Sequence, residues 1–213
     1  MPVRRGVFIA FEGLEGSGKT TQAKLLSAWL ETHGIDHILT REPGGTTVGE
    51  AIREILLHRD PVPPRAELLL MLAARATLLD QVVQPALAGG RVVIADRYEL
   101  STLAYQGYGR GIPLDDVRAI NAFATGGLAP DLTILLDVPV VEGEARRQRD
   151  GRQADRIESA GADFHARVAE AYRALGDCEP GVQRLDGTGS TESVHEEVKR
   201  LLRRRFPETF PVS

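Results

Sequence analysis

The sequence is poor in several features that would each have pointed to a class of protein. Its one cysteine, Cys178, excludes an internal disulfide and a multi-cysteine metal site, and is typical of a reducing compartment. The formal net charge of -4 argues against a basic surface for nucleic acid. No apolar run approaches the roughly 20 residues of a membrane span, and no signal-peptide core follows the first arginines. We therefore expect a cytoplasmic protein without nucleic-acid or membrane partners.

Strand-like and helix-like segments alternate along the chain. Its 213 residues, 42% hydrophobic and 26% charged, fit one globular domain, 1–213. Short β-branched or aromatic runs predict strands at 7–11, 38–39, 92–95, 132–136 and 182–185. Apolar positions at helical spacing predict helices at 19–31, 48–56, 65–87 and 190–205, the third of them buried. We expect an α/β three-layer sandwich with a five-stranded, mainly parallel sheet and ligands at the strand carboxyl ends.

The most specific local motif is a glycine-rich loop between the first strand and the first helix. It reads Gly13-Leu14-Glu15-Gly16-Ser17-Gly18-Lys19-Thr20, is followed by Thr21, and matches G-x-x-x-x-G-K-[ST] at every fixed position. Glycines let backbone N–H groups converge on phosphate oxygens at the positive end of a helix. Lys19 can bridge the β- and γ-phosphates, and Thr20 can offer its hydroxyl to Mg²⁺. The strand–loop–helix placement disfavours an incidental glycine turn and predicts a nucleoside triphosphate site.

The loop alone does not say what happens to the phosphate. The N-K-x-D motif of GTPases and the L-S-G-G-Q-like signature of ATP-binding transport subunits are absent. Asp96 and Arg97 stand at the end of the predicted strand 92–95. Asp96 can hold a magnesium-bound water, and Arg97 can clamp a phosphate through two hydrogen bonds. The alternative is a surface ion pair, which a neighbouring P-loop disfavours.

These residues belong to a collinear series of motifs, over about residues 7–160, that resembles the thymidylate kinase family. The series comprises Phe11-Glu12-Gly13, Thr40-Arg41-Glu42-Pro43-Gly44-Gly45-Thr46, Ala73-Ala74-Arg75, Asp96-Arg97-Tyr98, Ser101-Thr102-Leu103-Ala104-Tyr105-Gln106-Gly107, Pro130-Asp131-Leu132-Thr133, Leu136-Asp137-Val138 and Asp155-Arg156-Ile157-Glu158. The resemblance implies a P-loop NTP hydrolase-like fold, phosphorylation of dTMP to dTDP with ATP and Mg²⁺, and a homodimer.

The resemblance also implies roles on the acceptor side. Arg97 and Arg53 are expected to contact the 5′-phosphate of dTMP, while Asp96 works with Mg²⁺ between donor and acceptor. Glu12 is expected near the acceptor sugar or the metal. Arg41 and Ser101 are expected in the same acceptor site.

For the base, the resemblance implies that Arg75 hydrogen-bonds the thymine edge, that Thr102 and Gln106 line the base site, and that Tyr105 closes the space of a ribose 2′-hydroxyl. Residue chemistry leaves alternatives open. Arg75 can snorkel or form a structural ion pair, and Tyr105 and Gln106 can be packing and capping residues. Met71 departs from the family, because many relatives have a phenylalanine there, stacked on thymine. Methionine can still cover a base face, although the strictness of base choice is left open.

An arginine-rich segment at about 146–157 is the candidate lid. Its arginines can simply form a solvated helix face, with Glu142 and Arg146 as a helical ion pair. Family members carry a catalytic arginine in the P-loop or in a lid, and this P-loop has none. The chain therefore resembles the lid-arginine subtype, with Arg152 as the expected catalytic residue and Arg149 as the alternative.

Two other functions compete with dTMP phosphorylation. The nearer one is another P-loop nucleoside or nucleoside monophosphate kinase, and the more distant one is a nucleotide-switched binding protein. For a kinase we predict direct in-line transfer without a covalent intermediate, because the acceptor phosphate oxygen is already ionised at neutral pH. Catalysis then rests on positioning and charge neutralisation by Lys19, Asp96, Arg97, Arg152 and Mg²⁺.

Overall fold

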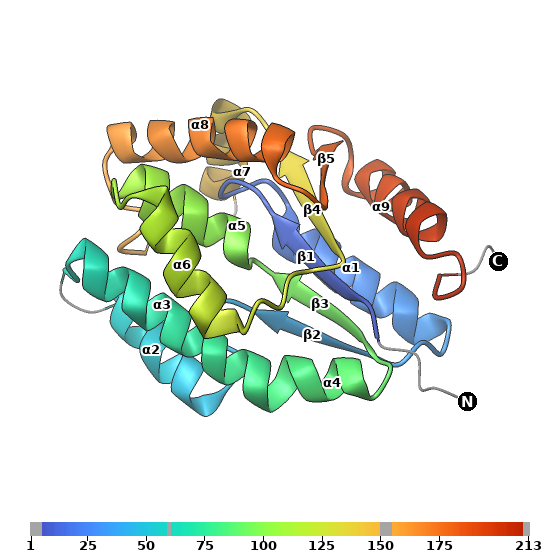
Figure 1. Cartoon of the computed structure of the whole chain (residues 1–213). Coiled ribbons are helices and arrows are strands. Elements are labelled where there is room, and N and C mark those ends of the chain that lie inside the picture. The colour runs from blue at the N-terminus through green and yellow to red at the C-terminus, as the bar shows by residue number, and fades with distance from the viewer. Residues whose placement is uncertain (1–5, 59–60, 150–154, 211–213) are drawn as a thin grey trace.

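A computed structural model describes residues 6–58, 61–149 and 155–210, and its centre is a parallel five-stranded sheet (Figure 1). The strand order is β2-β3-β1-β4-β5, and every neighbouring pair is parallel. The strands are β1 (Phe8–Glu12), β2 (His37–Arg41), β3 (Val92–Asp96), β4 (Leu132–Asp137) and β5 (Val182–Asp186). All five predicted strands, and the predicted α/β sandwich, are confirmed.

Helices cover both faces of this sheet. In the described part of the chain they are α1 (Lys19–Thr32), α2 (Thr47–His58), α3 (Pro64–Leu78), α4 (Gln84–Ala88), α5 (Glu99–Thr102), α6 (Leu114–Thr125), α7 (Val140–Arg149), α8 (Ala162–Cys178) and α9 (Thr191–Arg205). None of these helices is long and apolar enough to cross a membrane.

The two faces of β1 explain how the layers are held together. Side chains alternate along a strand, so Ile9 and Phe11 point to one face while Phe8 and Ala10 point to the other. The first pair packs in one buried cluster with α1 and α9, and the second packs with α4 and the end of α3. Because both faces are covered, every residue of β1 is buried. This central strand ends directly at the glycine loop.

Two helical segments widen into π-helical turns. The predicted helix 65–87 is continuous but has three parts, because the π-helical turn η1 (Leu79–Val83) lies between α3 and α4. Pro85 follows at once, and it has no N–H to continue the ordinary helical ladder. The second π-helical turn, η2 (Leu103–Gly109), extends α5. Such turns are rare in proteins, and those that occur often lie at functional sites.

Arg75, on α3, is a buried charge that joins three parts of the fold. It is 1% exposed. Its Nε–H donates to Glu42 at 2.7 Å, an NH2 group donates to the Tyr98 carbonyl at 2.8 Å, and the third nitrogen donates to Asn121. Burial alone would lower the pKa of Arg75, but the Glu42 carboxylate raises it. Arg75 therefore links α3 to the loop after β2, to the residue after Arg97, and to α6.

This burial predicts a large stability loss in Arg75→Met. The substitution leaves Glu42, 4% exposed, without its cation, and breaking one partner of a buried pair costs about 3–5 kcal/mol. Arg91→Met, which removes an exposed ion pair with Asp36, should cost no more than about 1 kcal/mol. Urea unfolding measures both, and equal losses would show that Arg75 has no special structural role.

Candidate functional site

The glycine loop forms the turn between β1 and α1 that the sequence predicts. Gly13, Gly16 and Gly18 all have positive φ, at 139°, 75° and 93°, which side chains other than glycine rarely adopt. At Gly16 a Cβ atom would also lie 2.1 Å from the Gly143 carbonyl oxygen of α7. Helix α1 begins at Lys19, with Gly18 as its N-cap. The N-terminal N–H groups of α1 are thus placed to face an anion.

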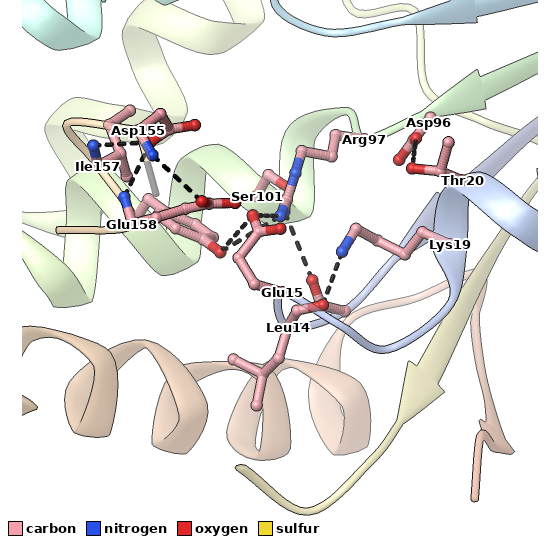
Figure 2. Close-up of polar contacts among 12 residues, drawn as sticks. Leu14, Glu15, Lys19, Thr20, Asp96, Arg97, Ser101, Asp155, Ile157 and Glu158 are labelled. Atoms are coloured by element: carbon pink, nitrogen blue, oxygen red, sulfur yellow. Dashed lines mark hydrogen bonds and ion pairs between the residues drawn. The ribbon is translucent and has the colours of Figure 1, made fainter. Parts of the chain in front are cut away.

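Lys19 is buried at the mouth of this loop, and Nζ donates to the Leu14 carbonyl at 2.7 Å (Figure 2). Burial, and then the neighbouring Arg97 cation, lower the pKa of Lys19 from 10.5 to about 8. A phosphate anion beside Nζ would oppose both effects. The lysine is therefore poised to gain its full charge as a triphosphate binds.

Thr20 and Asp96 bring two oxygen ligands together where β3 ends beside α1. The Thr20 hydroxyl donates to Asp96 Oδ2 (Figure 2). No cluster of three or more histidine, cysteine, aspartate or glutamate side chains suited to a metal exists in the described ranges. One hydroxyl and one carboxylate fit Mg²⁺, which is usually held by one or two protein oxygens together with phosphates and water. They do not form a closed, all-protein metal cage.

Arg97 points back from the end of β3 toward the glycine loop. Its backbone lies in the left-handed region, at φ 75°, which is uncommon for a non-glycine residue. Its guanidinium pairs with Glu15 of the loop (Figure 2). It also donates to Ser101 Oγ at 2.9 Å and to the Tyr172 hydroxyl at 3.1 Å. Its guanidinium carbon also lies 5.1 Å from the centroid of the Tyr105 ring, as a cation–π contact. Burial would lower the pKa of Arg97, but Glu15 and the tyrosines raise it well above its ordinary value.

Glu12 lies behind Arg97 and organises the turn from which it projects. This carboxylate is fully buried and accepts from the backbone N–H groups of Tyr98 and Ser101, at 2.8 and 3.0 Å. The hydroxyls of Ser101 and Tyr172 donate to it as well, at 2.6 and 3.1 Å. Glu12 therefore holds the backbone and the hydrogen-bond partners of Arg97 in place.

A cavity of about 660 Å³ connects the two phosphate-binding candidates. Glu15, Lys19 and Thr20 line it from the glycine loop and the start of α1, and Asp96 and Arg97 line it from the end of β3. The remaining predicted residues that line it are Arg41, Arg53, Met71, Ser101, Tyr105 and Gln106. The structure thus brings most of the predicted site together around one space large enough for a small ligand.

Of the residues predicted on the acceptor side, three do not line this cavity. Glu12 and Thr102 are fully buried, and Arg75 donates to protein acceptors instead of facing the space. The predicted hydrogen bond from Arg75 to a base is therefore not supported by this geometry. The structural ion pair, which the sequence left open, is what the structure shows, because Glu42 and Asn121 come from distant parts of the chain.

The arginines of the segment 146–157 have different surroundings. Arg152 lies outside the described residues. Arg149 is exposed in the last turn of α7, and Arg146 forms the predicted ion pair with Glu142. Arg156 does not belong to a solvated helix face, because its side chain pairs with the buried Glu67 at 2.7 Å.

Arg41 and Arg53 place two cations on the cavity wall beside β2 and α2. Arg53 donates to the Pro43 carbonyl at 2.9 Å, and Arg41 pairs with Glu50 at 3.0 Å. Burial, and then the nearby Arg41, lower the pKa of Arg53. An anion bound there would relieve this repulsion. Glu50 and Tyr172 were not predicted from the sequence. Neither belongs to a recognisable motif, and only the folded structure brings them beside Arg41 and Arg97.

Comparison with known proteins gives one consistent result. A family model described as thymidylate kinase matches residues 11–198. The thymidylate kinase of Synechococcus sp. (strain JA-3-3Ab) is 47% identical over 206 residues, which cover 96% of this chain and 99% of that protein. That of Kosmotoga olearia is 45% identical over 194 residues, covering 90% and 93%. The crystal structure of thymidylate kinase from Ehrlichia chaffeensis matches with a TM-score of 0.77 at 31% identity, covering 93% of this chain and 99% of that one.

The lowered pKa of Lys19 predicts a pH dependence of nucleotide capture. Above pH 8 or so the amine of the nucleotide-free protein is neutral, so kcat/KM for ATP should fall by up to about tenfold per pH unit. The turnover number should change less, because bound phosphate restores the charge. Steady-state kinetics with saturating acceptor measure both. Lys19→Arg, slower at every pH, should lack this fall, and a flat wild-type profile to about pH 9.5 would contradict the assignment.

Proposed function

The chain belongs to the thymidylate kinase family and phosphorylates dTMP to dTDP with ATP, and we propose that the transfer takes place in the cavity between the glycine loop and Arg97. The observation that carries this placement is the position of Arg97. Its guanidinium reaches the loop itself, so a phosphate held by Arg97 and the end of a triphosphate held by the loop would face each other.

On the donor side, the loop Gly13–Thr20 and the following Thr21 would hold the phosphates of ATP. Lys19 would neutralise charge on the β- and γ-phosphates. Thr20 and Asp96 would hold Mg²⁺, whose chemistry is to neutralise and orient phosphate oxygens. Neither residue needs a large movement for this, because their oxygens are already hydrogen-bonded to each other.

On the acceptor side, Arg97 and Arg53 would bind the 5′-phosphate of dTMP, with Arg41 and Ser101 beside them. The phosphate must compete with Glu15, which now occupies one side of the Arg97 guanidinium. Arginine has five N–H donors in a planar fork, so it can hold two anions in different directions. Binding of dTMP therefore requires Glu15 to shift or to share Arg97.

Met71, Tyr105 and Gln106 would surround the base and sugar. Met71 is 8% exposed and lines the cavity, so its thioether can cover a base face without an aromatic ring. The Tyr105 ring stands edge-on to Tyr172 and beneath Arg97, and these contacts would hold it in place beside the sugar. Thr102, which is buried behind these side chains, would support them without touching the base.

Transfer would be direct and in line, with no covalent intermediate. The acceptor oxygen is already ionised, so the protein's contribution is positioning and charge stabilisation. An arginine of the lid at about 146–157 would complete the charge stabilisation, with Arg152 as the candidate and Arg149 as the alternative. The exposed position of Arg149 means that it would have to turn inward.

We also propose that the chain works as a homodimer in the cytosol. Val48 and Ile55 on α2, Leu69 on α3 and Phe123 on α6 are exposed apolar side chains, and Phe123 is 89% exposed. Helix α3 packs against both α2 and α6, so these residues belong to one group of helices. The exposed thiol of Cys178 agrees with a reducing compartment, which cell fractionation would check.

Arg97→Ala tests the proposed transfer site. The substitution should lower conversion of dTMP to dTDP by roughly 10³-fold, because charge stabilisation at the acceptor phosphate is lost. The dissociation constant for ATP should change by less than about threefold, because the loop is intact. A coupled assay gives the rate, and calorimetry gives ATP affinity. The control is Arg118→Ala, which removes an ion pair with Glu179 outside the cavity.

Two outcomes would contradict the proposal. A folded Arg97→Ala protein with wild-type turnover would move the acceptor phosphate elsewhere. Faster phosphorylation of thymidine than of dTMP by the wild-type protein would contradict the monophosphate kinase activity itself.

The dimer proposal predicts the effect of charge on the apolar group. Leu69→Glu with Phe123→Glu should halve the mass in sedimentation analysis, because two charges would be buried at the interface. Val141→Glu alters an exposed apolar residue on α7 and should leave the mass unchanged. A wild-type protein that sediments as a monomer would refute the dimer.

A further inference from the structure

Glu67 is a fully buried carboxylate in the first turn of α3, and three side chains converge on it. Arg110 donates twice, from Nε to Oε1 and from NH2 to Oε2, both at 3.0 Å. Arg156 donates to Oε2 at 2.7 Å, and Gln106 Nε2 donates to Oε1 at 3.0 Å. The two arginines supply more charge than the carboxylate needs. The neutral Gln106 is the one member of this group that also lines the cavity.

The charge state of Glu67 decides which way the Gln106 amide points. Burial would raise the pKa of Glu67, but the hydrogen bonds from Arg110, Gln106 and Arg156 lower it. Glu67 is therefore ionised at neutral pH, and an ionised carboxylate only accepts hydrogen bonds. The amide of Gln106 must turn its N–H group toward Glu67, so its carbonyl oxygen must face away.

This orientation leaves a buried acceptor at the cavity wall. Gln106 is 1% exposed, and Oε1 finds no hydrogen-bond donor among the residues that the structure describes. A buried acceptor without a donor is costly, so a ligand that brings an N–H group is favoured. A 2,4-dioxopyrimidine has such a group at ring N3. Cytosine has an acceptor at the same ring position, which would face Oε1 unfavourably.

We propose that Glu67 is a positioning residue for base selection, because it locks Gln106 with its carbonyl oxygen toward the base. The proposal rests on the proposed function, since it assumes that the base lies beside Met71 and Gln106. Glu67 does not touch the base and acts through Gln106. It selects thymine over cytosine by excluding the flipped amide, which would offer a donor instead.

Arg156 extends the same network to the border of the arginine-rich segment. Its Nε–H donates to the Leu56 carbonyl at 2.7 Å, and its backbone N–H donates to the Leu57 carbonyl at 3.1 Å. Arg156 therefore fastens the chain just before Ile157, which lines the cavity, to the end of α2, and its pair with Glu67 fastens the same point to α3. The carboxylate of Glu67 thus contacts both Gln106, which would face the base, and Arg156, which anchors this segment.

A double-mutant cycle tests the proposal. Glu67→Gln removes the charge, so the Gln106 amide can adopt either orientation. It should lower kcat/KM for dTMP by about tenfold and reduce the preference for dTMP over dCMP, while KM for ATP stays unchanged. In a Gln106→Leu background, Glu67→Gln should cause no further loss. Equal losses in both backgrounds would overturn the proposal, because Glu67 would then act by a route other than Gln106.

A chemical probe provides a second arm of the test. N3-methyl-dTMP lacks the N–H donor, so the wild-type protein should use it about tenfold less well than dTMP. Glu67→Gln should use the two acceptors more equally. A wild-type protein that does not distinguish them would overturn the proposal, whereas a wild-type protein inactive toward dTMP itself would instead refute the proposed function.

Arg110→Gln is the matched control for a structural role. It removes two hydrogen bonds to Glu67 but leaves the contact with Gln106, so stability should fall while the dTMP over dCMP preference is retained. Thermal unfolding and the acceptor comparison measure the two effects. This variant decides the question even if Glu67→Gln does not fold. A preference lost in Arg110→Gln would show that intactness of the ion cluster, and not the orientation of Gln106, sets selectivity.

Discussion

The parallel pairing of β1 with β3 is the constraint on which the site depends. Its register places Phe11 beside Asp96, so the glycine loop after β1 and the turn after β3 leave the sheet next to each other. The Arg97 N–H donates to the Phe11 carbonyl at 2.9 Å, and this bond ties Arg97 to the end of β1. The left-handed backbone of Arg97 then aims its side chain back at the loop. Two anion-binding groups far apart in sequence become neighbours because two buried strands are paired in one register.

Buried carboxylates set the walls around this point. Glu12 holds the turn that carries Arg97, Glu42 holds Arg75 between helices, and Glu67 holds Gln106. Each is almost or fully buried, and each is matched by donors from other elements. A buried acid stabilises a structure only in the arrangement that satisfies it. The main effect of these acids is therefore specificity: they favour the one arrangement of the surrounding donors that satisfies them, and contribute less to overall stability.

Sequence patterns predicted the strands and the glycine loop, because both have local sequence signals. They also predicted that this loop meets Arg97, because the carboxyl ends of parallel strands lie at one edge of the sheet. The division of the predicted helix 65–87 by η1 was not predicted, since a π-helical turn is a change of hydrogen-bond register and not of residue type. For Arg75 the chain showed a charge in an apolar helix but not its partners. Glu67 carried the same signal and was missed, because an acid in the first turn of a helix is ordinary. The solvated helix face that the sequence left open for the arginines of 146–157 does not include Arg156, and its partner was missed for a similar reason: Glu67 lies 89 positions away.

The π-helical turn η2 has a consequence for the length of the chain as well as for its residues. Tyr105 and Gln106 both lie in this turn and face the cavity. The Arg110 N–H bonds to the carbonyl five residues earlier, at Tyr105. Removing one residue would restore the ordinary four-residue spacing and rotate all that follows by roughly 100° relative to what precedes. In evolution or in engineering, η2 should therefore tolerate a substitution more readily than an insertion or a deletion.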